Sequence, residues 1–327
     1  MPPASAAEWG LVWKESGNVI ITVTMNPAID KTVEIDCLQQ GGLNRISKVE
    51  YDAGGKGINV SKTIFELGGK SIATGFLAGN AGRTIKNVLD EKGIQNDFVW
   101  LDGETRTNTK VFEENGMVTE LNEPGPVPSE KELEALMGKL SEYASKDTLF
   151  VLAGSVPNGM DKNIYADIIN LVHKKGAKVL LDADGELFRN GLESMPDIIK
   201  PNRLELEEYA KFDYKASEQE IAQIARKLIK EGVSTVAVSM GKCGAMLLKE
   251  GYEAKAPALS VKAHSTVGAG DAMVAALSYA YESGMDNDET LKLGIATSAG
   301  AVTTIGTKPP AKELVMKLKE DVVLEEI

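Results

Sequence analysis

The stretch STVGAGDAMVAAL, residues Ser265–Leu277, ends a loop with two glycines, places an aspartate on the first turn of a predicted helix and continues as an apolar run. Backbone N–H groups at a helix start have no partner inside the helix and lie at the positive end of its dipole. Glycines let a phosphate oxygen approach those donors closely. A carboxylate there, Asp271, can take a proton from an attacking hydroxyl. The stretch indicates phosphoryl transfer, although an aspartate in a first helical turn is also ordinary capping.

Two familiar nucleotide-binding motifs do not fit this stretch. A dinucleotide fingerprint needs a third glycine where Met273 stands, and a Walker A loop needs Lys and Ser or Thr after its last glycine. Hydride transfer with a dinucleotide cofactor is therefore disfavoured.

The composition limits the class of partner. The chain has 327 residues, of which 43% are hydrophobic, enough for a sizeable core in one large domain or in a domain with an appendage. Its formal net charge is −12 at pH 7 without a basic run, which argues against nucleic acid or an anionic membrane as a partner. An anionic substrate must therefore be held by a few local cations.

Cysteine and histidine are scarce. Cys37 and Cys243 are too few for a disulfide framework or a Cys-based zinc site, and they suggest a reducing cytoplasm. His173 and His264 lie far apart in the sequence, which disfavours a His-based metal site. Because no apolar run approaches the length of a membrane span, we expect a cytoplasmic protein.

From Val19 onward, apolar runs alternate with helical patterns. Short runs typical of buried parallel strands lie at Val19–Met25, Lys70–Leu77, Thr148–Ala153, Lys178–Asp182, Asp197–Lys200 and Thr235–Met240. Helical spacing lies at Ile58–Leu67, Gly82–Lys92, Glu130–Ala144, Asn163–Lys175 and Glu218–Lys230. This alternation predicts a doubly wound α/β sheet, with a mostly helical last third. Residues 1–18 precede the first predicted strand and are interpreted as an N-terminal extension that could be disordered.

Two segments break the alternation. Residues 32–51 and 105–121 have the period of strands and contain turn residues, so they do not resemble crossover units. Strands from these two places can pair into a small sheet that covers the main one. Such a lid would exclude water from a reaction centre, whereas the plain alternative is a solvated β-meander.

Further candidate residues follow predicted strands or start helices. Asp30, after the first strand, can accept hydrogen bonds from sugar hydroxyls or simply form a turn. Gly55, Lys56 and Asn59 lie in a glycine-rich helix start that a sugar or a phosphate can approach, or that is an ordinary turn.

Cations and amides also recur at regular spacing. Arg106, Asn108 and Lys110 share one face of a predicted lid strand, which suits a substrate phosphate but also a solvated surface. Asn202 and Glu205 are three apart on one helical face and can order water around Mg²⁺, or act as a helix cap. Ser239–Gly244 is a glycine turn after a strand, suited to phosphate or to a tight hairpin.

Six motifs in order support a broader comparison: NPAID at 26–30, AGGKGINV at 53–60, GETRTN at 103–108, GSVP at 154–157, KPNRLE at 200–205 and STVGAGD at 265–271. With them, the chain closely resembles the phosphosugar-kinase branch of the ribokinase-like (phosphofructokinase B) family. The resemblance extends from about Val19 to the C-terminal helices. It implies a kinase domain over residues 19–327, with a Rossmann-like three-layer αβα core and a small β-sheet lid that often serves as a dimer clasp.

The resemblance also assigns roles to the candidate residues. It makes Asp271 the catalytic base and the backbone amides of Gly268, Ala269 and Gly270 the anion hole. It implies that the sugar phosphate is bound by Asp30, Gly55, Lys56, Asn59, Arg106, Asn108 and Lys110. It implies that ATP is held by Lys200, Asn202, Ser239, Gly241, Lys242, Gly244 and Gly270, with Mg²⁺ bound through water by Glu205 together with Asn202.

The activity implied by this resemblance is ATP-dependent phosphorylation of D-fructose 1-phosphate at its 6-hydroxyl, giving fructose 1,6-bisphosphate. The alternatives are phosphorylation of tagatose 6-phosphate at its 1-hydroxyl, and a non-catalytic phosphosugar sensor on the same fold. The expected partners are the phosphosugar, ATP and a second copy of the chain bound through the lid.

Overall fold

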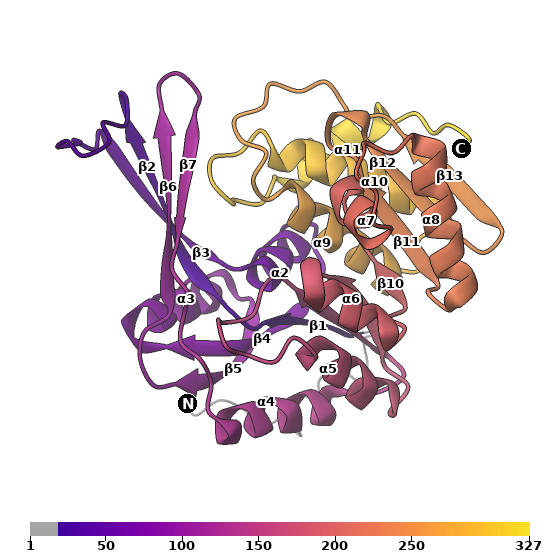
Figure 1. Cartoon of the computed structure of the whole chain (residues 1–327), viewed down its shortest axis with the longest axis horizontal. Coiled ribbons are helices and arrows are strands. Elements are labelled where there is room, and N and C mark those ends of the chain that lie inside the picture. Colours follow the sequence, from indigo (N-terminus) through magenta and orange to yellow (C-terminus); the bar gives the residue numbers. More distant parts are fainter. Residues whose placement is uncertain (1–18) are drawn as a thin grey trace.

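The computed structural model describes residues 19–327, and in this part of the chain nine strands form the main sheet (Figure 1). The strands are β1 Val19–Thr24, β4 Ser71–Ala78, β5 Gln95–Leu101, β8 Thr148–Ala153, β9 Lys178–Asp182, β10 Ile198–Ile199, β11 Thr235–Ser239, β12 Ala245–Lys249 and β13 Tyr252–Ala256. Their order is β13-β12-β11-β10-β9-β8-β1-β4-β5. All pairs from β11 to β5 are parallel, and β12 and β13 add an antiparallel edge.

Helices cover both faces of this sheet. One face packs against α4 Glu130–Tyr143, α5 Ile164–His173, α6 Gly185–Glu193, α7 Arg203–Tyr209 and α8 Glu218–Glu231. The other packs against α2 Lys56–Glu66, α3 Gly79–Lys92, α9 Ala269–Glu282, α10 Asn287–Ala301 and α11 Lys312–Glu320. Alternation explains why both faces are apolar: Ile21 and Val23 enter the first core, whereas Ile20, directly before Ile21, enters the second.

A second sheet of four strands projects from the core (Figure 1). It consists of β2 Ala28–Ile35, β3 Lys48–Gly54, β6 Arg106–Glu113 and β7 Val118–Asn122, in the order β3-β2-β6-β7. β2 and β6 are parallel, and the outer pairs are antiparallel. We call this sheet the lid. Its β6–β7 turn is at Asn115-Gly116, where the Gly116 N–H donates to the Glu113 carbonyl.

The predicted three-layer core with a small β lid is confirmed, but several boundaries were wrong. The lid begins at Ala28, so Asp30 lies inside strand β2 and not in a turn after the first core strand. The first core strand ends earlier than predicted, at Thr24, and the chain bends at Met25-Asn26 before it enters the lid. Strands β5, β12 and β13 and helix α6 were not predicted. The predicted extension, residues 1–18, lies outside the described residues. Within residues 19–327, the helices are too short or too polar to cross a membrane.

Candidate active site

A cavity of about 300 Å³ lies where the lid meets the carboxyl ends of the core strands. Ligands of open α/β sheets bind at this edge because the ends of parallel strands converge there. The predicted residues that line the cavity are Asp30, Gly55, Lys56, Asn59, Arg106, Asn108, Lys110, Gly268 and Asp271. They come from the lid and from the starts of α2 and α9, so the fold gathers segments that are far apart in the sequence.

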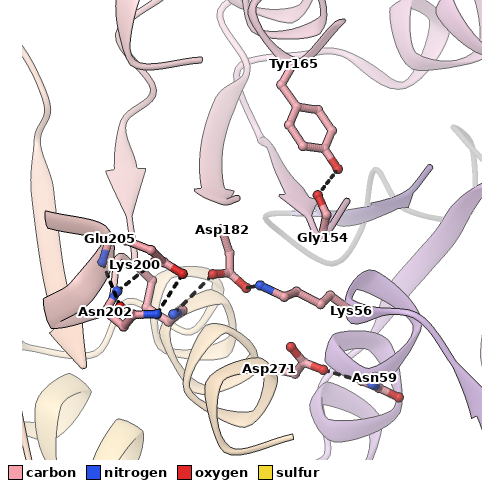
Figure 2. Close-up of polar contacts among 9 residues, drawn as sticks. All are labelled: Lys56, Asn59, Gly154, Tyr165, Asp182, Lys200, Asn202, Glu205 and Asp271. Atoms are coloured by element: carbon pink, nitrogen blue, oxygen red, sulfur yellow. Dashed lines mark hydrogen bonds and ion pairs between the residues drawn. The ribbon is translucent and has the colours of Figure 1, made fainter. Parts of the chain in front are cut away.

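Asp271 lies in the first turn of α9 and is 9% exposed. The Asn59 side chain donates a hydrogen bond from Nδ2 to Asp271 Oδ2 at 2.9 Å (Figure 2). Burial raises the pKa of Asp271 to about 6, although the positive charge of Lys56 opposes that shift. A carboxyl group with such a pKa is ionised at neutral pH and retains appreciable affinity for a proton, as a general base requires.

The helix start next to Asp271 has no capping side chain. Gly268 is the N-cap of α9 in a left-handed conformation, φ 85°, which favours glycine, and no side chain caps the helix. The first intrahelical bond runs from the Ala272 N–H to the Gly268 carbonyl. The preceding amides of Gly268, Ala269 and Gly270 therefore remain available to an anion at the positive end of the helix.

Lys56, which lines the cavity, also contacts a buried carboxylate that was not predicted. Its Nζ donates to Asp182 Oδ2 at 3.2 Å, and Lys200 Nζ forms an ion pair with Asp182 Oδ1 at 3.1 Å. Figure 2 shows the two lysines reaching Asp182 from opposite sides. The charge of Asp182 raises the pKa of Lys56 above its usual range. Burial opposes ionisation of Asp182, but Lys200 and Lys56 outweigh it and lower its pKa.

Asn202 and Glu205 form a capping box at the start of α7. Asn202 Oδ1 accepts from the Glu205 N–H at 2.9 Å, and Glu205 accepts from the Asn202 N–H at 2.8 Å. Burial raises the pKa of Glu205, partly offset by Lys200. Within residues 19–327, no three His, Cys, Asp or Glu side chains cluster to hold a metal ion. A protein cage for Mg²⁺ is therefore absent there, whereas binding through water fits these residues.

The predicted phosphate turn Ser239–Gly244 lies next to this capping box and outside the lining of the cavity. The Ser239 N–H donates to the Pro201 carbonyl, and Ser239 forms a β-bridge with Asn202. Gly241–Cys243 is a short 3₁₀ turn between the antiparallel strands β11 and β12. The turn is therefore a tight connection beside Asn202.

On the lid, Arg106 is held by backbone carbonyls. Its guanidinium donates to Glu123 at 3.1 Å and to Asn26 at 3.0 Å, and its buried Nε has no hydrogen-bond partner among the described residues. Lys110 Nζ lies 3.5 Å from Asp30 Oδ2. Similarly unpartnered buried oxygens line the cavity at Thr24, Asn26, Asn59 and Asn108. Because an unsatisfied buried polar group costs about 1–3 kcal/mol, this lining favours a ligand rich in hydroxyl groups and negative charge.

The register of the lid explains why these groups face the cavity together. Asp30 pairs with Asp52 on one side and Asn108 on the other, and Asn108 pairs with Asn122. Residues in register point to the same face of a sheet. Gly54 keeps the adjacent position open, because a Cβ there would lie 2.4 Å from Asp30 Oδ2.

Some lining residues were missed in the sequence, among them Ser155, Glu120, Asn122 and Thr307. Asp182 was missed as well, although it ends a strand that the sequence did predict. A carboxylate at the carboxyl end of a buried parallel strand was the signal that could have found it.

Comparisons with known proteins identify the family of the chain. The chain matches the model of the pfkB family carbohydrate kinases over residues 17–314. It is 37% identical to 1-phosphofructokinase of Borreliella burgdorferi, over 88% of this chain and 92% of that protein, and 36% identical to 1-phosphofructokinase of Rhodobacter capsulatus, over 94% and 97%. The tetrameric inhibited form of phosphofructokinase-2 from Escherichia coli superposes with a TM-score of 0.86, at 25% identity over 93% and 99%. The chain belongs to the pfkB family and is a ribokinase-like carbohydrate kinase.

Proposed function

We propose that this kinase transfers the γ-phosphate of ATP to the 6-hydroxyl of D-fructose 1-phosphate, giving fructose 1,6-bisphosphate. The observation that carries the proposal is the position of Asp271, a buried carboxylate held by Asn59 beside the amides of a helix start. The cationic side chains of Arg106 and Lys110 line the same cavity from the lid. A base and an anion hole at the core, with cations on the lid, suit a substrate that has a hydroxyl at one end and a phosphate at the other.

In the proposed reaction Asp271 acts as general base. Asp271 Oδ2 is engaged by Asn59, so Oδ1 is the oxygen that takes the proton of the 6-hydroxyl. The 6-oxygen bonds to the γ-phosphorus as the bond between that phosphorus and the β,γ-bridging oxygen breaks, and ADP leaves with the electron pair. The amides of Gly268, Ala269 and Gly270 stabilise the charge on the phosphoryl oxygens in transfer.

We propose that ATP lies along the edge formed by Lys200, Asn202 and the Ser239–Gly244 turn, which is contiguous with the anion hole. The Asn202–Ser239 bridge supports this path. Mg²⁺, when bound with ATP, neutralises phosphate charge and keeps several waters, and Glu205 with Asn202 would accept hydrogen bonds from those waters. Lys200 and Lys242 supply further positive charge for the phosphates.

Asp30 on the lid, with Gly55 and Asn59 at the start of α2, would accept or approach the sugar hydroxyls. Arg106, Asn108 and Lys110 on the lid would bind the phosphate. The unpartnered Nε of Arg106 and Oδ1 of Asn108 support this division. The relatives named 1-phosphofructokinase support fructose 1-phosphate as the substrate. Tagatose 6-phosphate, phosphorylated at its 1-hydroxyl, is the alternative within the same class.

The test is ADP release with Mg²⁺ and ATP against fructose 1-phosphate, fructose 6-phosphate and tagatose 6-phosphate, with fructose as the control without a phosphate. The proposal expects the highest kcat/KM with fructose 1-phosphate. A higher value with tagatose 6-phosphate would select the alternative. Tight binding of a sugar phosphate with no ADP release from any of them would indicate a sensor.

We further propose that the chain forms a homodimer through the lid. The lid and its connecting loop expose large apolar side chains, including Leu43, Tyr51 and Leu121, and the related phosphofructokinase-2 has a tetrameric form. Sedimentation velocity tests this assembly. Leu121→Glu should shift the chain toward the monomer, and an unchanged mass distribution would count against the lid as the interface.

A further inference from the structure

Asp182 is a buried carboxylate at the edge of the site, and the reaction described above gives it no role. It ends β9, is 2% exposed, and its backbone carbonyl accepts a hydrogen bond from the Gly154 N–H at 3.0 Å. This bond fixes the end of β9 beside the end of β8. Because ligands bind beyond the carboxyl ends of parallel strands, the sheet brings Asp182 to the reaction centre.

Two lysines from distant parts of the chain converge on this one carboxylate. Lys56 starts α2 and Lys200 follows β10, and their ammonium groups lie 3.2 and 3.1 Å from the two oxygens of Asp182. Lys200 is 4% exposed, and a Cβ built on Gly270 would lie 3.8 Å from its Nζ. Lys56 lines the cavity together with Asp271. Each ammonium group therefore lies close both to Asp182 and to the reaction centre (Figure 2).

Asp182 is the carboxylate that both lysines contact directly. The charges of Asp271 and Glu205 also act on Lys56, but among the described residues neither carboxyl forms an ion pair with Lys56 or Lys200. Asp182 therefore holds two ammonium groups in place next to the start of α9, where a bound phosphate group could contact them.

We propose that Asp182 is a positioning residue that holds the ammonium groups of Lys56 and Lys200 beside the anion hole and keeps them from pairing with Asp271. The proposal rests on the role of Asp271 as base in the proposed function. Cations that are already in place stabilise the charge of a transferring phosphoryl group without reorganising during the reaction. A direct ion pair between either lysine and Asp271 would weaken the base.

The test compares Asp182→Asn with a matched control at the other end of the same strand pair, Asp197, which directly precedes β10. Asp197 lies by the opposite end of β9, where it also contacts two nitrogen-bearing side chains, Lys178 Nζ at 2.8 Å and His173 Nε2 at 3.0 Å. The measurement is kcat and KM for ADP release with fructose 1-phosphate, from acid to alkaline pH. We expect kcat of Asp182→Asn to fall by about 10–100-fold, as for other residues that orient catalytic groups. Asp197→Asn should leave kcat unchanged.

The acid limb of the pH profile separates positioning from a loss of folded protein. The charged groups that act on Asp271 are Lys56 and Lys62 on α2, Asp182 at the end of β9 and Lys200 after β10. Removing the negative charge of Asp182, and freeing the two lysines to approach Asp271, both favour the ionised base. The acid limb of Asp182→Asn should therefore move to lower pH, whereas partial unfolding would lower kcat at every pH alike.

Three results would overturn the proposal: wild-type kcat and acid limb in Asp182→Asn, an equal loss in Asp197→Asn, or recovery of Asp182→Asn by excess Mg²⁺, which would place Asp182 on the metal. Should the single variant not fold, Asp182→Asn combined with Lys200→Met removes one charge of each sign. This pair should lose turnover with a smaller acid shift, because Lys200 itself lowers the pKa of Asp271, and wild-type turnover in it would overturn the proposal. Asp271→Asn is measured alongside, because normal turnover there removes the proposed base whatever Asp182 does.

Discussion

The core and the lid contribute to the candidate site in different physical ways. The core supplies two buried carboxyl groups, Asp182 at the end of strand β9 and Asp271 in the first turn of helix α9. The lid supplies Arg106 and Lys110 from a thin sheet whose outer strand β7 is mostly exposed. The contrast suggests that chemistry depends on the core and recognition on the lid, so substitutions in the core should change kcat and those in the lid should change KM.

The contacts that join the lid to the C-terminal loops are polar or slight. Lys308 Nζ lies 2.9 Å from Glu50, and Thr307 donates to Asp30 at 3.5 Å. The Phe112 and His264 rings have centroids 6.4 Å apart. Since such contacts are weaker than core packing, the lid can adjust to a ligand at less cost than the core can.

The largest effect is expected at the core. Asp271→Asn should lower kcat by about 10²–10⁴-fold because a positioned base is lost, while ATP and the sugar phosphate still bind. Steady-state kinetics and equilibrium binding check both parts. Near-normal turnover would remove Asp271 from the mechanism and break the division between core and lid.

The same variant should be more stable at alkaline pH. Burial raises the pKa of Asp271 to about 6, above its unfolded value. The folded protein is therefore most stable, as far as Asp271 is concerned, at a pH below the pKa that this carboxyl has in the unfolded chain. That stability is lost as the pH rises through 6. Removing the ionised carboxyl should raise the free energy of unfolding by at most about 3 kcal/mol at pH 8. Urea denaturation at pH 8 and pH 4 measures this difference, and a less stable variant at pH 8 would contradict it.

The pH dependence of the wild type gives the next effect. Below about pH 6 the Asp271 carboxyl is protonated and cannot accept the hydroxyl proton, so kcat should fall about tenfold per pH unit on the acid side. The residual turnover of Asp271→Asn should lack this limb. A limb that persists in the variant would assign the titration to another group.

A smaller effect, on KM, is expected from the lid. Arg106→Ala should raise KM for fructose 1-phosphate by about 10–100-fold, since a charged hydrogen bond contributes about 1.5–3 kcal/mol, with kcat within a few-fold of wild type. Lys31→Met is the matched control: Lys31 is on the opposite face of β2, over the Tyr51 ring at 5.9 Å. An unchanged KM in Arg106→Ala would dismiss the lid as the phosphate site.

The smallest effect is expected at the connection between lid and core. Lys308→Met removes the salt bridge to Glu50. The Lys308 side chain is 51% exposed and the Glu50 side chain 20% exposed. Partly exposed bridges contribute up to about 1 kcal/mol, so KM for the sugar phosphate should change by no more than about fivefold. Raising the salt concentration should reduce the difference from wild type. A large fall in kcat would show that the lid controls chemistry as well as recognition.

Much of the architecture followed from the sequence because its signals are local. Apolar runs such as Thr148–Ala153 and helical spacing such as Glu218–Lys230 matched strands and helices within a residue or two. The lid was also predicted, but its start was misplaced. Aspartate is common in turns that follow strands, so the local sequence favoured a turn at Asp30. The pairing of β2 with β6 places Asp30 inside a lid strand. Pairing partners lie too far along the chain for a local pattern to identify them.

The site was predicted in its residues more than in its contacts. Asp271 and the glycines before it stood out because a helix start with glycines is a local feature. Asp182 did not, because its meaning depends on Lys56, which is 126 positions away.

The sequence by itself determined where strands, helices and glycine-rich helix starts occur, because backbone preferences and the alternation of apolar side chains act over a few residues. Only the tertiary structure decided which strand ends meet, that Asn59 holds Asp271 across 212 positions, and that the carboxyl is buried enough to raise its pKa to about 6. The physical reason is that desolvation and charge–charge interactions depend on distance in space. Local sequence patterns do not contain that distance.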